Sequence, residues 1–403
     1  MELTATSLQV AAILLAVGGL AGSAWWLWPR LSARTWPAVL GRVGVLVGNQ
    51  VLTLGALALL INNYFGFYGS WDDLLGSGRG AAAPIVADLE QEPPDAPSSA
   101  RVQVMSSSPV TLSRGGQRYQ GGRLEHVVVT GAASTLSAPA YVYLPPQYFD
   151  PRYAGTRFPA VLVLTGYPGD ARNLITRMNI PATAARSIDR REMAPAILIL
   201  MRPTLAPPRD TECMDVPDGP QVETFFTKDL REAMAGVFRV GTEPASWGVL
   251  GGSTGGYCAL KMSMRHPESF GAAASLSGYY RPPADATTGD LFGGSPDLAQ
   301  ENDLMWRLAN LPHPPISVLV TSSRKGESNY RTTLDFLAAV RPPMQAASLI
   351  LPSGGHNFTT WNRELPQALP WIVSRLRLPD EIAATPAPAP GPATSAAPVA
   401  PTP

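Results

Sequence analysis

A serine set between closely spaced glycines is the residue of this chain best suited to nucleophilic chemistry. The apolar run Trp247–Leu250 is followed by Gly-Gly-Ser253-Thr-Gly, a G-x-S-x-G pattern that leads into residues able to start a helix. A strand, a tight turn and a helix in this order push the serine hydroxyl out above the ends of the strands. The backbone N–H of Thr254 then lies at a helix N-terminus and can donate to an oxyanion. Ser253 is therefore the candidate nucleophile.

A serine hydroxyl needs a base within hydrogen-bonding reach, and the base needs an acid that orients it. The chain has four histidines, and three of them follow Ser253. His266 stands before a proline at an expected helix end, and His313 stands before an expected strand, so we predict structural roles for both. His356 follows the apolar run Ala347–Leu351 in Ser-Gly-Gly-His. The two glycines let the chain turn sharply and present the imidazole, so His356 is the candidate base.

The orienting acid is expected in the loop that follows the strand-like run Ile316–Thr321. Glu327 is the carboxylate of that loop, which reads SSRKGESNY. Asp335 is the alternative, but it lies within Tyr330–Val340, a predicted helix. We therefore favour Glu327 as the orienting acid. The alternative is that Glu327 is a solvated loop residue that pairs with a neighbouring side chain.

An oxyanion hole needs a second N–H from the turn after an earlier strand. The run Pro159–Thr165 ends in Gly166-Tyr167-Pro168-Gly169. Proline has no N–H, so the backbone of Tyr167 is the expected donor beside Thr254. The side chain of Tyr167 could equally form a wall of the pocket, which is compatible with that backbone role.

The elements that must position these residues alternate between apolar runs and helical stretches. Runs such as VLVL and AILIL are typical of strands that are buried on both faces. The expected strands are His126–Thr130, Ala140–Leu144, Pro159–Thr165, Ala196–Met201, Trp247–Leu250, Ala272–Ser277, Ile316–Thr321 and Ala347–Leu351. The expected helices include Lys228–Phe238, Tyr257–Met264 and Tyr330–Val340. This alternation predicts an α/β fold with a mainly parallel sheet covered on both faces, and an antiparallel edge formed by the first two strands.

Two apolar segments near the N-terminus are long enough to cross a bilayer, which needs about 20 residues. The first runs from Leu8 to Trp28 without a charge, and the second from about Val43 to Phe65. No basic residue precedes the first segment, which argues against a cleaved signal peptide. Asn49 and Gln50 in the second segment are expected to face the other helix rather than lipid. The alternative is a pair of buried core helices.

Basic residues predict the orientation of this hairpin. Arg30, Arg34 and Arg42 lie between the two segments, so the positive-inside rule places the connection in the cytoplasm. Everything after Phe65 is then outside the cytoplasm, and the chain is a multi-pass protein of the cell membrane. We expect a hairpin in 1–75, a flexible Gly/Ala/Pro-rich linker in 76–99, the α/β domain in 100–378 and a disordered Ala/Pro-rich tail in 379–403.

The composition excludes several function classes. Lys plus Arg equals Asp plus Glu at 31 each, so no basic excess points to nucleic acid. The two cysteines and four histidines do not have zinc-ligand spacing. We therefore expect neither a metal nor a cofactor, and no nucleic-acid partner.

Three motifs in the same order resemble the esterase D branch of the α/β-hydrolases, which includes the mycolyltransferases of actinobacterial envelopes. They are YLPPQYFDPRYAGTRFPAVLVLTGYPG, GGSTGGYCAL and SGGHNFTTW, and the resemblance covers roughly Val102 to Leu378. The hairpin followed by NYFGFYGSWDDLLG is similar to membrane-anchored members of this family. The resemblance implies Ser253 as nucleophile, His356 as base and Glu327 as acid. The turn TGYPG departs from the commoner HG-x-GG oxyanion motif, and mycolyltransferases usually carry a cleaved signal peptide instead of a hairpin.

The two cysteines lie near this predicted site. Cys258 is five residues beyond the nucleophile, and Cys213 is in the loop RDTECMDVP. In a compartment outside the cytoplasm we expect them to form a disulfide, and the alternative is two separate buried thiols. Asp215 in the same loop could orient substrate or be structural.

These expectations describe a membrane-anchored serine esterase that acts on carboxylic esters through an acyl-enzyme, with lipid and glycolipid esters among the candidate substrates. An acyltransferase that moves the acyl chain to an envelope sugar or lipid hydroxyl would use the same residues. A hydrolase-like binding module without catalysis, or a serine peptidase, are further alternatives, but each member of the triad is present and no accessory peptidase domain is indicated.

Overall fold

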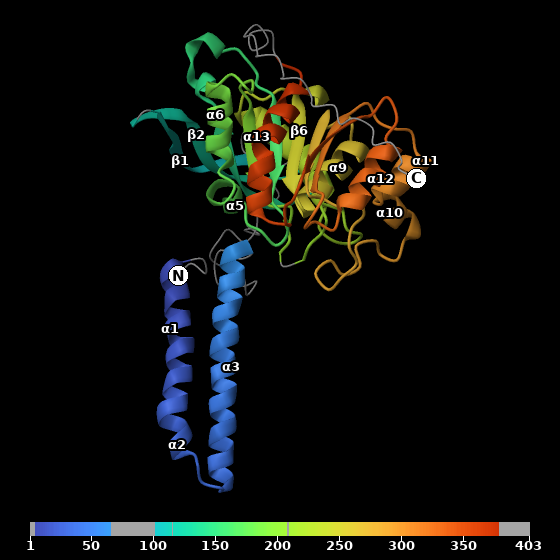
Figure 1. The fold of residues 1–403 in the computed structure, drawn as a ribbon. Helices are drawn as coiled ribbons and strands as arrows, with labels where there is room; N and C mark the ends of the chain where they lie inside the picture. Colours follow the sequence, from blue (N-terminus) through green and yellow to red (C-terminus); the bar gives the residue numbers. More distant parts are fainter. Residues whose placement is uncertain (1–4, 66–100, 115, 208, 379–403) are drawn as a thin grey trace, which may run out of the picture.

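The computed structural model describes residues 5–65, 101–114, 116–207 and 209–378, which form an apolar helical hairpin and an α/β domain. The predicted linker at 76–99 and the predicted tail at 379–403 lie outside the described residues. Figure 1 shows the two long helices of the hairpin in blue and the sheet of the α/β domain with its covering helices.

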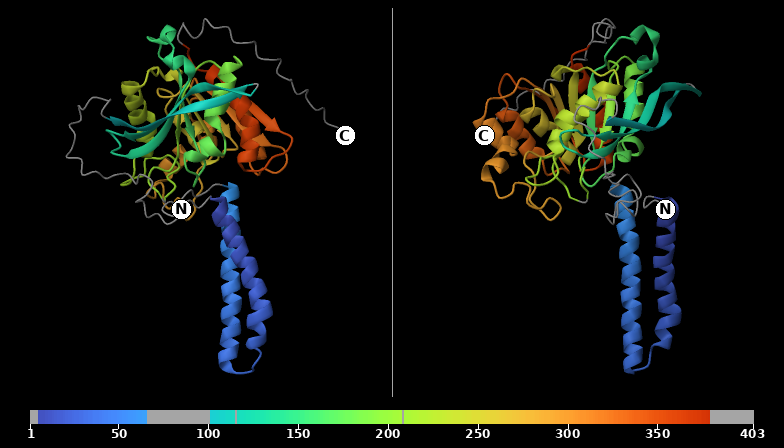
Figure 2. Two further views of the ribbon diagram at one scale, coloured as in Figure 1. Left: turned by 90° about the vertical axis from the view of Figure 1, so that its left-hand side faces the viewer. Right: turned by 180° about the vertical axis from the view of Figure 1, so that it is seen from behind.

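The hairpin consists of two antiparallel segments that lie side by side in the views of Figures 1 and 2. The first comprises α1 (Thr6–Gly22), a π-helical turn (Ser23–Leu27) and α2 (Trp28–Arg30), and the second is α3 (Trp36–Phe65). By length and composition both can cross a membrane, with mean hydropathies of 1.8 and 1.9 and little surface buried within the protein. The second helix begins at Trp36 rather than near Val43 as predicted, because Pro37 is favourable in the first turn of a helix.

Of Asn49 and Gln50 in α3, only Asn49 faces the partner helix as predicted. The Ser23 hydroxyl donates to Asn49 Oδ1 at 3.3 Å, and the Asn49 side chain also lies against Gly19. Gln50 is exposed on the outer surface of the hairpin, so the prediction that it faces the other helix is wrong. Because residues 49 and 50 are about 100° apart on a helix, a narrow helix–helix contact can take only one of them.

A sheet of nine strands forms the centre of the α/β domain, in the spatial order β1-β2-β3-β5-β4-β6-β7-β8-β9. The strands are β1 (Val102–Arg114), β2 (Gln117–Thr130), β3 (Ser137–Leu144), β4 (Ala160–Leu164), β5 (Ile197–Met201), β6 (Trp247–Gly252), β7 (Ala272–Leu276), β8 (Ser317–Ser323) and β9 (Gln345–Leu351). The first three strands pair antiparallel, β3 pairs antiparallel with β5, and β4 to β9 are parallel. This confirms the predicted mainly parallel sheet with an antiparallel edge.

Strand β1 is an addition to the predicted set, and it pairs with β2 as a long ribbon at one edge of the sheet (Figure 1). Its sequence VQVMSSSPVTLSR is rich in serine and contains Pro109, and most of its side chains are exposed. A strand at a sheet edge can carry proline and polar side chains because it packs little of its surface. For the same reason it lacks the apolar signal by which the inner strands are recognised.

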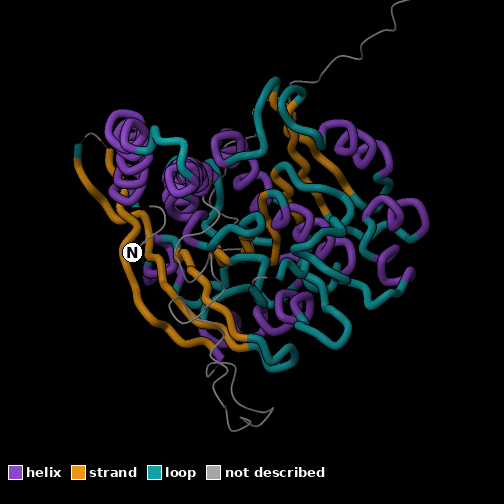
Figure 3. Tube along the Cα trace, turned by 90° about the horizontal axis from the view of Figure 1, so that it is seen from below, coloured by secondary structure: helices purple, strands orange, loops and turns teal. Residues whose placement is uncertain are grey.

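Helices cover both faces of the sheet, as Figure 3 shows in purple against the orange strands. One apolar core contains side chains of α8, α9, α11 and α12, and a separate core on the other face contains those of α6 and α13. The helices of the domain are α5 (Arg172–Thr176), α6 (Ile180–Asp189), α7 (Val222–Thr224), α8 (Leu230–Val237), α9 (Thr254–Arg265), α10 (Pro296–Glu301), α11 (Leu304–Asn310), α12 (Tyr330–Ala339) and α13 (Phe358–Ser374). Short 3-10 or π-helical turns lie at Pro146–Phe149, Pro151–Tyr153, Phe225–Asp229 and Pro244–Ser246. Parallel strands all end at the same edge, and that edge carries the predicted site residues.

Candidate active site

Ser253 lies in the turn between β6 and α9, at the carboxyl edge of the sheet. Its φ of 55° and ψ of −120° are dihedrals that a residue with a side chain rarely adopts. The Ser253 N–H donates to the Leu276 carbonyl of β7 at 3.0 Å, which ties the strained residue to the neighbouring strand. The turn thus holds the hydroxyl above the strand ends, the conformation that the G-x-S-x-G pattern predicts.

Glycines make this turn sterically feasible. A Cβ on Gly251 would overlap the backbone of Gly255, and a Cβ on Gly255 would overlap the carbonyl oxygens of Leu164 and Thr165. The helix α9 therefore starts in direct contact with the end of β4. Only glycine permits this approach, because every other residue would place an atom inside the neighbouring backbone.

His356 is brought to the serine by the loop between β9 and α13. Its Nε2 lies 2.8 Å from Ser253 Oγ, within hydrogen-bonding distance. The ring packs edge-on against Trp361 of α13, with 5.4 Å between the ring centroids. Although part of the ring is exposed, desolvation by the surrounding protein lowers the His356 pKa, and the nearby Glu327 charge partly opposes this. A neutral imidazole at pH 7 can accept the serine proton.

The two glycines before His356 act through close packing rather than through a left-handed turn. Neither Gly354 nor Gly355 has a positive φ, so the chain reaches His356 without a left-handed glycine. A Cβ on Gly354 would overlap Ser323 Oγ and lie 2.7 Å from the Thr360 side chain. The glycine at position 354 therefore lets the histidine loop lie directly on the end of β8.

Glu327 lies in the loop after β8, which packs against the histidine loop. The Gly354 N–H donates to the Lys325 carbonyl at 3.0 Å, and Gly326, with a φ of 95°, packs against the Gly354 carbonyl. The carboxylate of Glu327 is close enough to raise the pKa of His356 by its charge. Both its oxygens are buried, and neither has a hydrogen-bond partner among the described residues. The alternative acid, Asp335, is exposed on α12.

A second carboxyl group, Glu364 of α13, lies behind Glu327 and was not among the predicted site residues. Its side chain is fully buried, and Glu364 Oε2 accepts a hydrogen bond of 2.8 Å from the Thr321 hydroxyl, whereas Oε1 has no partner in the described part of the chain. Burial, with a contribution from the Glu327 charge, raises the Glu364 pKa to about 8. One signal was available in the sequence: Glu364 interrupts the apolar stripe of α13, which includes Trp361, Leu365 and Ala368.

The predicted oxyanion donors, Thr254 and Tyr167, belong to two segments that adjoin Ser253. Thr254 is the first residue of α9, where N–H groups have no acceptor within the helix. A Cβ on Gly166 would be 3.0 Å from the Ser253 Cβ, so the turn that contains Tyr167 touches the nucleophile. The Thr165 hydroxyl donates to the Gly169 carbonyl at 2.9 Å and holds this turn. The segments that carry the two predicted donors thus both contact the nucleophile.

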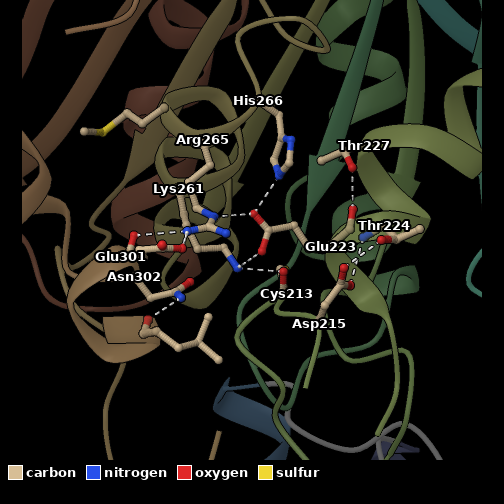
Figure 4. Close-up of polar contacts among 12 residues, drawn as sticks. Cys213, Asp215, Glu223, Thr224, Thr227, Lys261, Arg265, His266, Glu301 and Asn302 are labelled. Carbon is tan, nitrogen blue, oxygen red and sulfur yellow. Dashed lines mark hydrogen bonds and ion pairs between the residues drawn. The ribbon is translucent and has the colours of Figure 1, made fainter. Parts of the chain in front are cut away.

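The structure bonds Cys213 to Cys258, with an S–S distance of 2.12 Å. The bond attaches the loop before α7 to α9, the helix that follows the nucleophile. Asp215 of the same loop accepts hydrogen bonds from the N–H and the hydroxyl of Thr224, at 2.9 and 2.6 Å. Asp215 therefore stabilises the start of α7, which favours the structural interpretation of this residue (Figure 4).

The remaining histidines that follow the serine lie away from it. His266 ends α9 and contacts the carboxylates of Glu223 and Glu268, at 3.0 and 2.8 Å. His313 contacts the Leu308 carbonyl and the Arg341 N–H. Within the described ranges no group of three or more His, Cys, Asp or Glu side chains has the geometry to hold a metal ion.

Two known proteins are similar to parts of this chain in sequence. An uncharacterized protein from Corynebacterium glutamicum is 26% identical over 247 residues, which cover 59% of this chain and 57% of that protein. The MPT51 antigen from Mycobacterium leprae is 35% identical over 74 residues, which cover 18% of this chain and 24% of the antigen. The chain thus spans little more than half of the first relative's length and a quarter of the second's.

The fold is shared with an S-formylglutathione hydrolase from Agrobacterium tumefaciens. The TM-score is 0.55 at 13% sequence identity, and the match covers 68% of this chain and 100% of the hydrolase. The family model described as "Putative esterase" matches residues 135–372, more than half of the chain, and includes the predicted nucleophile, acid and base. The chain belongs to this esterase family, and its α/β domain has the α/β-hydrolase fold.

Proposed function

We propose that this protein is a serine esterase that cleaves carboxylic esters through Ser253, His356 and Glu327. The observation that carries the proposal is the 2.8 Å contact between His356 Nε2 and the hydroxyl of a serine held at a φ of 55°. An esterase needs a base at this distance from an exposed nucleophile. A binding module without catalysis would gain nothing from the strained turn.

In the first half of the reaction Ser253 Oγ attacks the ester carbonyl, and its proton passes to His356 Nε2. The negative charge that develops on the carbonyl oxygen is stabilised by the backbone N–H groups of Thr254 and Tyr167. The C–O bond to the alcohol then breaks, and the alkoxide takes the proton from His356. The acyl group remains on Ser253 as an ester.

In the second half a water molecule gives its proton to His356 and attacks the acyl-enzyme, and the released serine recovers that proton. The Glu327 carboxylate stabilises the imidazolium that forms twice in the cycle. Its two oxygens have no competing partner among the described residues, so they are available to His356 Nδ1 when substrate draws the site together. If a sugar or lipid hydroxyl replaces water, the same acyl-enzyme performs acyl transfer.

We further propose that the hairpin anchors the domain on the extracytoplasmic side of a membrane. Arg30 and Arg34 lie at the turn of the hairpin, which favours a cytoplasmic turn. The disulfide between Cys213 and Cys258 supports an oxidising compartment for the domain. In intact cells, external protease should then remove a tag placed after residue 403, and protection of that tag would contradict this orientation.

The activity is tested with a fluorophosphonate probe and a short-chain soluble ester on membranes that contain the full chain. Wild type should take the label and hydrolyse the ester, whereas Ser253→Ala should do neither and His356→Ala should lose most of both. His313→Ala is the matched control and should behave as wild type, because His313 lies away from the serine. A folded wild type that neither takes label nor releases alcohol would refute the proposal. Release of alcohol that accelerates when a sugar or lipid alcohol is added would indicate acyl transfer.

A further inference from the structure

The loop that contains Glu212 is fastened to the helix behind the nucleophile by several independent contacts. Cys213 is bonded to Cys258 of α9, and the fully buried ammonium of Lys261 donates to the Cys213 carbonyl at 2.7 Å (Figure 4). Glu212 and Cys213 both have a positive φ, of 50° and 54°, which non-glycine residues rarely adopt. This backbone is held in one conformation, which fixes the direction in which the Glu212 side chain leaves the loop.

The Glu212 side chain points to a tyrosine that also contacts the residue after the nucleophile. Tyr279 Oη lies 2.6 Å from each oxygen of the Glu212 carboxyl group and 3.1 Å from Thr254 Oγ1. The Tyr279 ring stacks on Tyr257 of α9, with 5.1 Å between the centroids. Glu212 is fully buried and Thr254 almost so. The three residues form a hydrogen-bonded chain that ends beside Ser253, and Tyr279 is its one half-buried member.

The hydrogens available to this chain indicate its protonation state. The Tyr279 phenol has one hydrogen, but three oxygens surround it. Burial, and next the charge of Asp210, raise the pKa of the Glu212 carboxyl well above its usual range. A protonated Glu212 donates its hydrogen to Tyr279 Oη, and this leaves the phenolic hydrogen free to donate to Thr254 Oγ1. The two hydrogens then serve the contact with one Glu212 oxygen and the contact with Thr254 Oγ1.

We propose that Glu212 and Tyr279 are positioning residues for the oxyanion hole, in which a neutral Glu212 carboxyl group orients the Tyr279 hydroxyl and this hydroxyl fixes Thr254. The inference rests on the proposed esterase function. Thr254 follows the strained serine and begins α9, so its N–H direction depends on how firmly its side chain is held. A negative charge at Glu212 would also oppose the charge that develops on the substrate carbonyl, whereas a neutral acid does not.

Steady-state kinetics of the full-length protein in detergent, with p-nitrophenyl butyrate, test this chain. Tyr279→Phe should lower kcat roughly 10- to 100-fold and leave KM within about twofold, because the oxyanion contact is made in the transition state. Tyr280→Phe is the matched control: it removes a neighbouring buried hydroxyl that contacts Thr333 at 3.0 Å, and kcat should not change. The thermal midpoint of each variant reports whether it is folded.

The Glu212 variants separate a neutral acid from a carboxylate. Glu212→Gln keeps a donor at this position and should retain kcat within about threefold, whereas Glu212→Ala should lose as much as Tyr279→Phe. The double variant Glu212→Ala/Tyr279→Phe should lose little more than either single variant, because both interrupt one chain. A folded Glu212→Gln that is as impaired as Glu212→Ala would overturn the neutral-acid role, and a Tyr279→Phe with unchanged kcat would overturn the whole inference.

Failure of the proposed function gives a different result. A folded wild type that neither hydrolyses the ester nor takes the fluorophosphonate label refutes the esterase and this inference together. An active wild type whose Tyr279→Phe and Glu212→Ala variants show a changed KM at unchanged kcat leaves the esterase intact, and assigns the chain to substrate binding instead.

Discussion

Buried carboxyl groups lie on both sides of the candidate site. On one side the carboxyl group is surrounded by positively charged side chains, and on the other side the carboxyl groups form no ion pair among the described residues. Behind α9, Glu223 contacts Lys261 at 3.3 Å, Arg265 at 2.8 Å and His266 at 3.0 Å (Figure 4). On the side of His356, Glu327 and Glu364 form no ion pair among the described residues, and three of their four oxygens have no hydrogen-bond partner there.

The effect of this difference appears in the pKa values. Burial alone would raise the pKa of Glu223, but Lys261, His266 and Arg265 hold it well below the usual range. The pKa of Glu364 is raised to about 8 by burial, and the hydrogen bond from Thr321 and the charge of Arg363 offset only part of this. Compensated charges hold a scaffold together, whereas uncompensated buried carboxyl groups are unfavourable for stability and are typical of functional sites. Substitution of each group should therefore affect a different property.

The largest effect is expected on catalysis from Glu327→Gln. Loss of the charge that stabilises the imidazolium should lower kcat roughly 10³-fold or more, while the thermal midpoint changes little. The His356 pKa is already lowered, so the acidic limb of kcat/KM should lie below about pH 6.5 in wild type. Because Glu327 raises that pKa, the limb of the Gln variant should move to lower pH.

A pH–rate profile of residual activity measures this shift, with Asp335→Asn as the matched control for a carboxylate on the neighbouring helix. Asp335 is exposed, so its variant should keep both the rate and the limb of wild type. A limb that moves to higher pH in Glu327→Gln would mean that Glu327 does not act on His356.

The next effect is on stability and comes from Glu223→Leu. The substitution leaves the buried ammonium of Lys261 without its carboxylate, which should lower the free energy of unfolding by about 3–5 kcal/mol. Chemical denaturation in detergent measures it. Glu232→Gln is the control, since its half-exposed ion pair with Arg101 at 3.5 Å should contribute less than about 1 kcal/mol. Equal losses in both variants would contradict the distinction between the two regions.

The smallest effect is a change in how stability depends on pH, produced by Glu364→Gln. In the folded wild type this group keeps its proton up to about pH 8, whereas in the unfolded chain it releases it near pH 4.5. The folded state therefore binds more protons in that window, and wild-type stability should fall as pH rises through it. The Gln variant has no such group. Its free energy of unfolding relative to that of wild type should therefore increase by on the order of 1 kcal/mol or more between pH 5 and pH 8. Parallel stability curves for the two proteins would refute the raised pKa.

The sequence was informative where local geometry and chemistry coincide. The turn at Ser253 needs small neighbours, an apolar strand before it and a helix after it. All three features can be recognised in one short segment of the sequence. Strands buried on both faces, such as β4 and β5, are continuous apolar runs and were located to within a residue or so. The histidine was found because few candidates followed the serine.

Sequence alone was weaker where a contact joins distant segments. Glu212 and Tyr279 meet only when the loop before α7 packs against the loop after β7, and no local pattern marks that packing. The one local signal for Glu364 is its place as a charged residue within the apolar stripe of α13. Helix α13 was not predicted because Pro366 and Pro370 lie inside it, although its apolar stripe is continuous apart from Glu364. Tertiary burial outweighs the local preference against proline in that helix.

Gly251 and Gly255 are in direct contact, so the turn at Ser253 requires the absence of two side chains as much as it requires the serine hydroxyl. Consider a library of every single substitution, scored both for the amount of protein that accumulates and for turnover per molecule. Variants of Ser253 should accumulate normally and be inactive. Variants of either glycine should be missing from the accumulated pool, because a side chain on Gly251 would overlap the start of α9 and one on Gly255 would overlap the end of β4. The two glycines, which have no reactive group, would then tolerate substitution as poorly as the nucleophile. Only the two scores together would show that the glycines are needed for folding and Ser253 for catalysis.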